Sequence, residues 1–141
     1  MTDPLHANPV REVPDVVACL KGVGTLDWRY RPKMQTQCFE AAGEICLADD
    51  NNEGQCMQSL VLSIREYYDR LLPMLPADID ENGVQKWRYA SSLANIRDTF
   101  LSVSQCSEII GYNKTTCEFI TLGVALSELM YLAGEAKIDL P

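Results

Sequence analysis

The segment CFEAAGEIC, residues Cys38–Cys46, is the most informative stretch for the fold of this 141-residue chain. Its two cysteines stand eight positions apart around residues that favour helices. In a helix, which rises about 1.5 Å per residue, their Cα atoms would lie about 12 Å apart. A disulfide needs Cα atoms within about 7 Å. The segment is therefore predicted to be a helix whose two cysteines pair with two different partners.

The cysteine count is even, so all cysteines can pair: Cys19, Cys38, Cys46, Cys56, Cys106 and Cys117. Cys46 ends one predicted helix and Cys56 starts the next, so the turn between them favours their pairing. Cys106 and Cys117 flank a later helix turn in the same way, which leaves Cys38 for Cys19. The last pair would tether the N-terminal part of the chain to the helices, and each closure should contribute about 2–4 kcal/mol.

This cysteine usage argues against metal and redox chemistry. No CxxC pair occurs, and the single histidine is His6, in a proline-rich start. Six cysteines in 141 residues fit an oxidising compartment. The start MTDPLHANPV has no apolar signal core. Either the chain is a mature form with an added Met, or it is cytosolic, and the cysteine count favours a periplasmic or secreted protein whose signal peptide has been removed.

The pattern of helix formers and turn formers predicts an all-α fold, a disulfide-stapled, four-helix bundle-like domain with an extended N-terminal arm. The arm, 1–14, holds three prolines, and a single helical domain spans 15–141. A short helix begins after Asp15 and stops at the glycines 22 and 24. Longer helices are predicted at 33–48, 53–72 (or to 75), 84–104 and 116–133, the last being the most apolar and ending at Gly134.

Two local features point further. In TLDWRYRP (25–32) apolar and charged residues alternate, which predicts a short strand or an extended cover over the core. In KWRY (86–89) Trp87 is expected to face the core, while Lys86 and Arg88 face solvent.

The net charge, 12 − 20 = −8, disfavours binding to nucleic acid. If charge decides partner choice, the partner is a basic protein; the alternative is that the charge serves solubility alone. The apolar runs are too short to span a bilayer, so no membrane span is expected.

The chain offers no recognisable catalytic apparatus. No Ser-His-Asp or Cys-His arrangement is available, and KGVGT (21–25) is not a phosphate loop. Acidic residues gather at 49–53 and 78–81, in turns where they are expected to cap helices and face water. We therefore expect no catalytic residue, no metal, no cofactor and no enzymatic activity.

Partner binding is the function class that the surface residues favour. Trp, Tyr and Arg are the residue types that anchor interfaces, and WRYRP is the basic spot of an acidic chain. The alternative is that Trp28 and Tyr30 seal the core while the arginines pair with surface acids. The candidate binding residues are, from this segment and from the acidic turns, Trp28, Arg29, Tyr30, Arg31, Asp49, Asp50, Asp78 and Asp80.

Four segments together resemble a known family: CFEAAGEIC, a Cys-started helix with two tyrosines, QKWRYASSLANIRDTFLSVSQC and CEFITLGVALSELMYL. They are similar to the LprI-type domain family of small secreted or periplasmic helical bacterial proteins, over about residues 38–132. The chain departs from the family pattern in YYDRLLPMLP (67–76).

The resemblance implies an envelope protein, and for one branch of the family it implies inhibition of lysozyme. The expected function is thus that of a non-enzymatic binding protein that inhibits a basic lysozyme-like enzyme by protein–protein contact. The alternative is a structural or assembly module of the cell envelope.

Overall fold

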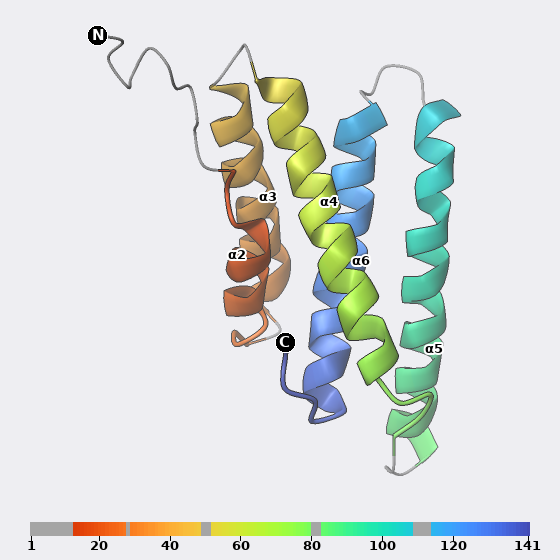
Figure 1. Cartoon of the computed structure of the whole chain (residues 1–141). Coiled ribbons are helices and arrows are strands. Elements are labelled where there is room, and N and C mark those ends of the chain that lie inside the picture. Colours follow the sequence, from red (N-terminus) through yellow and green to blue (C-terminus); the bar gives the residue numbers. More distant parts are fainter. Residues whose placement is uncertain (1–12, 28, 49–51, 80–82, 109–113) are drawn as a thin grey trace, which may run out of the picture.

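A computed structural model of the chain describes residues 13–27, 29–48, 52–79, 83–108 and 114–141 (Figure 1). Within these ranges the chain is helical and has no strand, which confirms the all-α prediction. The α-helices are α2 (Val16–Val23), α3 (Arg31–Leu47), α4 (Glu53–Leu71), α5 (Gly83–Leu101) and α6 (Lys114–Glu135). Two 3₁₀ segments extend α4 and α5, namely η1 (Leu72–Met74) and η2 (Ser102–Glu108).

Helix α6 is the centre of the bundle. It packs mainly against α4 and α5, and it also contacts α2, α3 and η2. Figure 1 shows α4 and α6 in the middle, α5 along one flank and α2 with α3 along the other. The apolar circumference that predicted a buried last helix supplies the core side chains Phe119, Leu122, Leu126 and Leu129.

Among the described helices, α6 is the one long and apolar enough to cross a membrane by length and composition. Half of its most apolar window is buried inside the bundle. A core helix passes the same test, so the absence of a membrane span stays a prediction.

Three disulfides link consecutive elements. Cys19–Cys38 joins α2 to α3, Cys46–Cys56 joins α3 to α4, and Cys106–Cys117 joins η2 to α6. The Cα–Cα distances are 5.8, 5.4 and 5.6 Å, within the ordinary disulfide range. These pairs are the ones that the cysteine spacing predicts.

The prediction of a strand or extended cover at 25–32 is wrong. Thr25 to Tyr30, apart from residue 28, form turns, and α3 begins at Arg31. The Asp27 carboxylate accepts the backbone N–H of Arg29 at 3.0 Å, and the Asp27 carbonyl accepts that of Tyr30 at 2.9 Å. Pro32 then sits in the first turn of α3, where its missing N–H costs nothing. The hydrogen bonds of the Asp27 turn therefore decide the local structure, and the short alternation of apolar and charged residues does not produce a strand.

The prediction that Trp87 faces the core is also wrong, because its side chain is 71% exposed. Tyr89 is buried instead and donates its hydroxyl proton to the Pro76 carbonyl at 2.7 Å. Leu93 and Ile96 continue this buried face of α5. Since two residues turn a helix by about 200°, burying Tyr89 directs Trp87 to solvent. Lys86 and Arg88 are exposed, as predicted.

The ends of two helices show one correct and one incorrect prediction. Asp15 caps α2 by accepting the N–H of Ala18 at 3.0 Å, as predicted. Helix α6 continues past Gly134, and the chain reverses at Lys137, whose φ is 60°. The Ile138 N–H donates to the Ala133 carbonyl at 2.8 Å, the signature of a Schellman motif. This later reversal lets Ile138 pack against the core.

Of the predicted N-terminal arm, 1–14, only residues 13 and 14 belong to the described part of the chain, and they are not helical. Residues 1–12 lie outside it.

Candidate functional site

Half of the predicted binding residues belong to the described chain. Arg29 and Tyr30 lie in the turn between α2 and α3, and Arg31 opens α3. Asp78 follows η1. The other four predicted residues lie outside the described residues: Trp28, Asp49, Asp50 and Asp80.

Arg31 lines a wide, shallow hollow of about 600 Å³. The α2–α3 turn contributes Leu26 and Asp27 to it, α5 contributes Arg88, and α6 contributes Tyr131. Residues far apart in sequence therefore meet at the end of the bundle where α6 finishes. Here the predicted WRYRP segment meets one residue of KWRY.

The contact between Arg31 and Tyr131 anchors this hollow. The Arg31 guanidinium lies 4.0 Å from the centre of the Tyr131 ring, which is cation–π geometry. A hydrogen bond to the Glu135 carboxylate, reinforced by partial burial, raises the pKa of the Tyr131 phenol. Tyr131 is thus contacted by Arg31 of α3 on its ring and by Glu135 of its own helix at its hydroxyl, while 40% of the residue is exposed.

The turn beside Arg31 is held by its own charges. The Arg29 guanidinium pairs with the Asp27 carboxylate at 3.2 Å, and the backbone and side-chain hydrogen bonds from Arg29 lower the pKa of Asp27. Arg29 also lies 5.8 Å from the Tyr30 ring centre. Tyr30 is 58% exposed, so it does not seal the core, whereas Arg29 does pair with a surface acid as the alternative expected.

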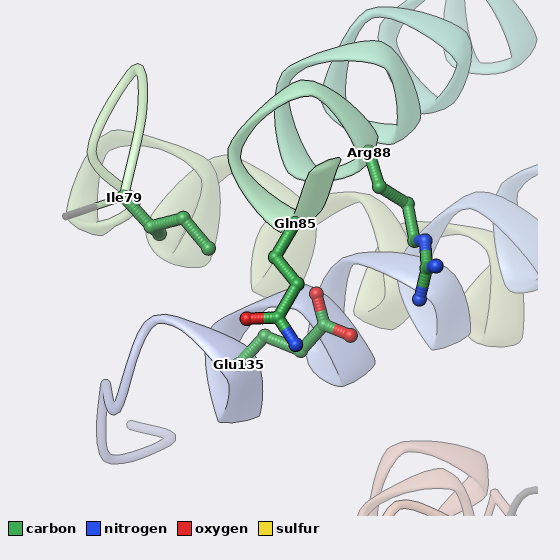
Figure 2. Close-up of a pocket in the computed structure, with 4 residues that line it drawn as sticks. All are labelled: Ile79, Gln85, Arg88 and Glu135. Atoms are coloured by element: carbon green, nitrogen blue, oxygen red, sulfur yellow. The ribbon is translucent and has the colours of Figure 1, made fainter. Parts of the chain in front are cut away.

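A second hollow, of about 220 Å³, shares Arg88 with the first. Figure 2 shows Gln85 and Arg88 extending from α5 toward Glu135 of α6, with Ile79 at the side. The nearby candidate Asp78 is paired with Lys86 at 3.3 Å, and both side chains are half exposed. Such a surface pair contributes little to stability, and Asp78 does not line the hollow.

A third hollow shares Tyr131 with the first and includes Glu128, whose pKa is raised by partial burial. Because neighbouring hollows share Arg88 or Tyr131, we treat them as one surface. We define the α5–α6 groove by five side chains: Arg31, Arg88, Glu128, Tyr131 and Glu135.

Sequence reasoning missed the contributions of α5 and α6 to this groove. A usable signal was present, because Glu128, Tyr131 and Glu135 recur at spacings of three and four in the mostly apolar second half of α6. A polar stripe on a central helix marks the part of its circumference that neighbouring helices leave uncovered. The spacing of residues along the sequence could not show that α3 places Arg31 against this polar stripe of α6.

The groove combines an aromatic ring, two guanidinium groups and two carboxylates on a shallow surface. Among the described residues, no group of three or more His, Cys, Asp or Glu could hold a metal ion. The arrangement can form hydrogen bonds, ion pairs and stacking contacts with another macromolecule.

No family model matches the chain, and the searches of curated proteins and of solved structures found no match. The resemblance to the LprI-type family therefore stays a prediction from the residues quoted above.

Proposed function

We propose that this chain is an exported, non-enzymatic binding protein that contacts a protein partner through the α5–α6 groove. The observation that carries the proposal is the convergence of Arg31, Tyr131 and Arg88 from three distant segments. Tyrosine and arginine dominate interface hot spots because each offers a large contact area together with hydrogen bonds. Their positions are constrained before binding, which reduces the entropy lost on association.

Export is supported by the disulfides. Three disulfides in a chain of this size are consistent with an extracellular or periplasmic environment, because cytosolic reductants keep most thiols reduced. They also tie α2, α3 and α4 together and join η2 to α6, so the groove is built on a constrained scaffold.

Charge favours a basic partner. A net charge of −8 steers a cationic protein toward the chain and raises its association rate. Within the groove the charges of the two arginines are balanced by two carboxylates. The net charge of the whole molecule would therefore attract the partner, and the tyrosine and arginine side chains of the groove would hold it. A basic lysozyme-like enzyme, the target class that the LprI-type resemblance implies, meets this requirement.

The test is a cell-wall lysis assay with c-type and g-type lysozymes, combined with direct measurement of binding. Tyr131→Ala and Arg31→Ala should each weaken binding about tenfold or more. Lys33→Ala is the matched control, because it removes the same charge from an exposed position in the same helix turn. Absence of protection at micromolar protein would contradict the lysozyme-inhibitor function. Equal losses of binding affinity in the Arg31→Ala and Lys33→Ala variants would contradict the α5–α6 groove as the binding surface.

A further inference from the structure

A separate hollow lies at the opposite end of the bundle, where α3 ends and α4 and α6 begin (Figure 1). Its volume is about 190 Å³. Phe39, Met57 and Phe119 line it from the core side. Leu47 and Ile120 flank it and are 55% and 43% exposed, so apolar surface continues outward from the hollow.

Two glycines explain why the hollow exists. Phe39 lies directly against Gly123 of α6, where an added Cβ would collide with its ring. The Phe39 ring also meets the Phe119 ring edge to face at 5.6 Å. One turn after Phe39, Gly43 lines the hollow, and a Cβ added there would meet nothing within 4 Å. Gly123 lets the Phe39 ring lie close against α6, where Phe39 and Phe119 form the aromatic floor of the hollow. Gly43 leaves the space above this floor open.

The charge around this apolar surface has one sign. Glu40 and Glu53 are the ionisable side chains among the described residues that line the hollow. They come from different helices, α3 and α4, so carboxylates approach the apolar surface from two elements. An apolar hollow with carboxylates beside it, on a chain of charge −8, is complementary to an apolar group that carries positive charges next to it.

The volume indicates the size of the occupant. A cavity of about 150 Å³ holds a benzene-sized molecule, whereas pockets for drug-sized ligands begin at about 300 Å³. A hollow of 190 Å³ therefore suits a single large side chain rather than a whole cofactor. Filling such a pocket with one buried anchor is a common way for a peptide segment to bind.

We propose that this hollow is a docking site for a basic peptide segment that inserts one aromatic or large aliphatic side chain between flanking lysines or arginines. The inserted side chain would cover Phe39 and Phe119, and the flanking cations would pair with Glu40 and Glu53. The proposal does not rest on the α5–α6 groove, which lies at the other end of the bundle.

The probe is the fluorescein-labelled peptide acetyl-KKFKK-amide, with binding followed by fluorescence anisotropy. The matched peptides are KKSKK, which keeps the charge and lacks the anchor, and EEFEE, which keeps the anchor and reverses the charge. The proposal expects KKFKK to bind about tenfold or more tightly than either, and to weaken as salt rises. Equal binding of KKFKK and KKSKK would reduce the interaction to non-specific charge attraction and overturn the proposal.

Variants of the protein locate the site. Gly43→Leu places a side chain in the hollow and should weaken KKFKK binding at least tenfold. Its control is Gly22→Leu, at another helical glycine where an added Cβ meets nothing within 4 Å. A Cβ at Gly43 meets nothing within 4 Å, and leucine favours a helix more than glycine does, so the melting temperature of Gly43→Leu should not fall. A loss of peptide binding without a loss of melting temperature would therefore come from blocking of the hollow and not from unfolding.

A charge series completes the test. The double variant Glu40→Gln, Glu53→Gln should weaken KKFKK binding about two- to thirtyfold, as expected for two partly exposed ion pairs. The double variant Glu66→Gln, Asp69→Asn changes the net charge equally at exposed positions of α4 and should leave binding unchanged. Undiminished binding to Gly43→Leu, or equal weakening by the two double variants, would contradict the proposal.

Discussion

At the scale of single residues, two helical glycines sit in opposite environments. An added Cβ at Gly123 meets the Phe39 ring, whereas one at Gly43 meets open space. Replacing either by alanine gains the same helix propensity, about 0.5–1 kcal/mol. Gly43→Ala should therefore stabilise the fold by about that amount. Gly123→Ala should be less stable than Gly43→Ala by about 1–3 kcal/mol, the usual cost of overpacking.

Urea denaturation of both variants measures this difference, and their common propensity gain cancels in the comparison. The Phe39 ring can relieve part of the clash by tilting into the hollow, so the cost should fall near the lower end of that range. Equal stability of the two variants would show that the Phe39–Gly123 contact does not constrain the aromatic floor.

Lys137 adopts the left-handed conformation, with φ of 60°, at the end of α6. A side chain in this conformation costs about 1 kcal/mol relative to glycine, partly offset by the greater entropy of an unfolded glycine. Lys137→Gly should therefore raise the free energy of unfolding by about 0.5–1 kcal/mol. Lys137→Ala controls for the lost charge and should not stabilise. Thermal unfolding distinguishes them, and a glycine variant no more stable than the alanine variant would contradict the prediction.

At the scale of elements, α5 has one apolar face in the core and an exposed tryptophan on the other side. Leu93 is buried and Trp87 is 71% exposed. Leu93→Ala should cost about 2–5 kcal/mol, through lost burial and the cavity left behind. Trp87→Gln should change the free energy of unfolding by less than about 0.5 kcal/mol. Chemical denaturation checks both values, and a Trp87→Gln cost near that of Leu93→Ala would place Trp87 in a packed interface.

The sequence predicted the helices and the cysteine pairs because both depend on local rules. Turn formers in the sequence mark the boundary between the predicted helices at 33–48 and 53–72, and helix rise alone keeps Cys38 from pairing with Cys46. The facing of Trp87 could not be predicted in the same way. Helix α5 carries apolar residues on two neighbouring sides, and the choice between them depends on which side faces α6. The α5–α6 groove likewise exists only because three distant segments meet.

At the scale of the whole molecule, the disulfides divide the helices into two linked groups. One group contains α2, α3 and α4, and the other contains η2, which continues α5, and α6. No disulfide among the described residues connects the two groups. They are held together by the packing of α4 against α6, with smaller contacts of α2 and α3 against α6. The stability of the bundle therefore depends both on the disulfides within each group and on the packed core between the groups.

Each cross-link closes a short loop, so its removal should cost a similar amount. The sequence separations are 10 for Cys46–Cys56, 11 for Cys106–Cys117 and 19 for Cys19–Cys38. The chain-entropy relation gives about 3 kcal/mol for loops of this size. Replacing both cysteines of any one pair by alanine should therefore lower the free energy of unfolding by about 3 kcal/mol. Urea denaturation of the three double variants under oxidising conditions provides the measurement.

Loss of all three links by reduction should lower stability by several times that amount, which exceeds or matches the total for many domains of this size. The chain would then unfold in a cytosol-like glutathione buffer and stay folded in an oxidising one. Circular dichroism in the two buffers tests this directly, with the unreduced protein as the control. A reduced chain that keeps its helical signal and its melting temperature would mean that the core alone sustains the bundle, and the argument from disulfides to an exported protein would lose its basis.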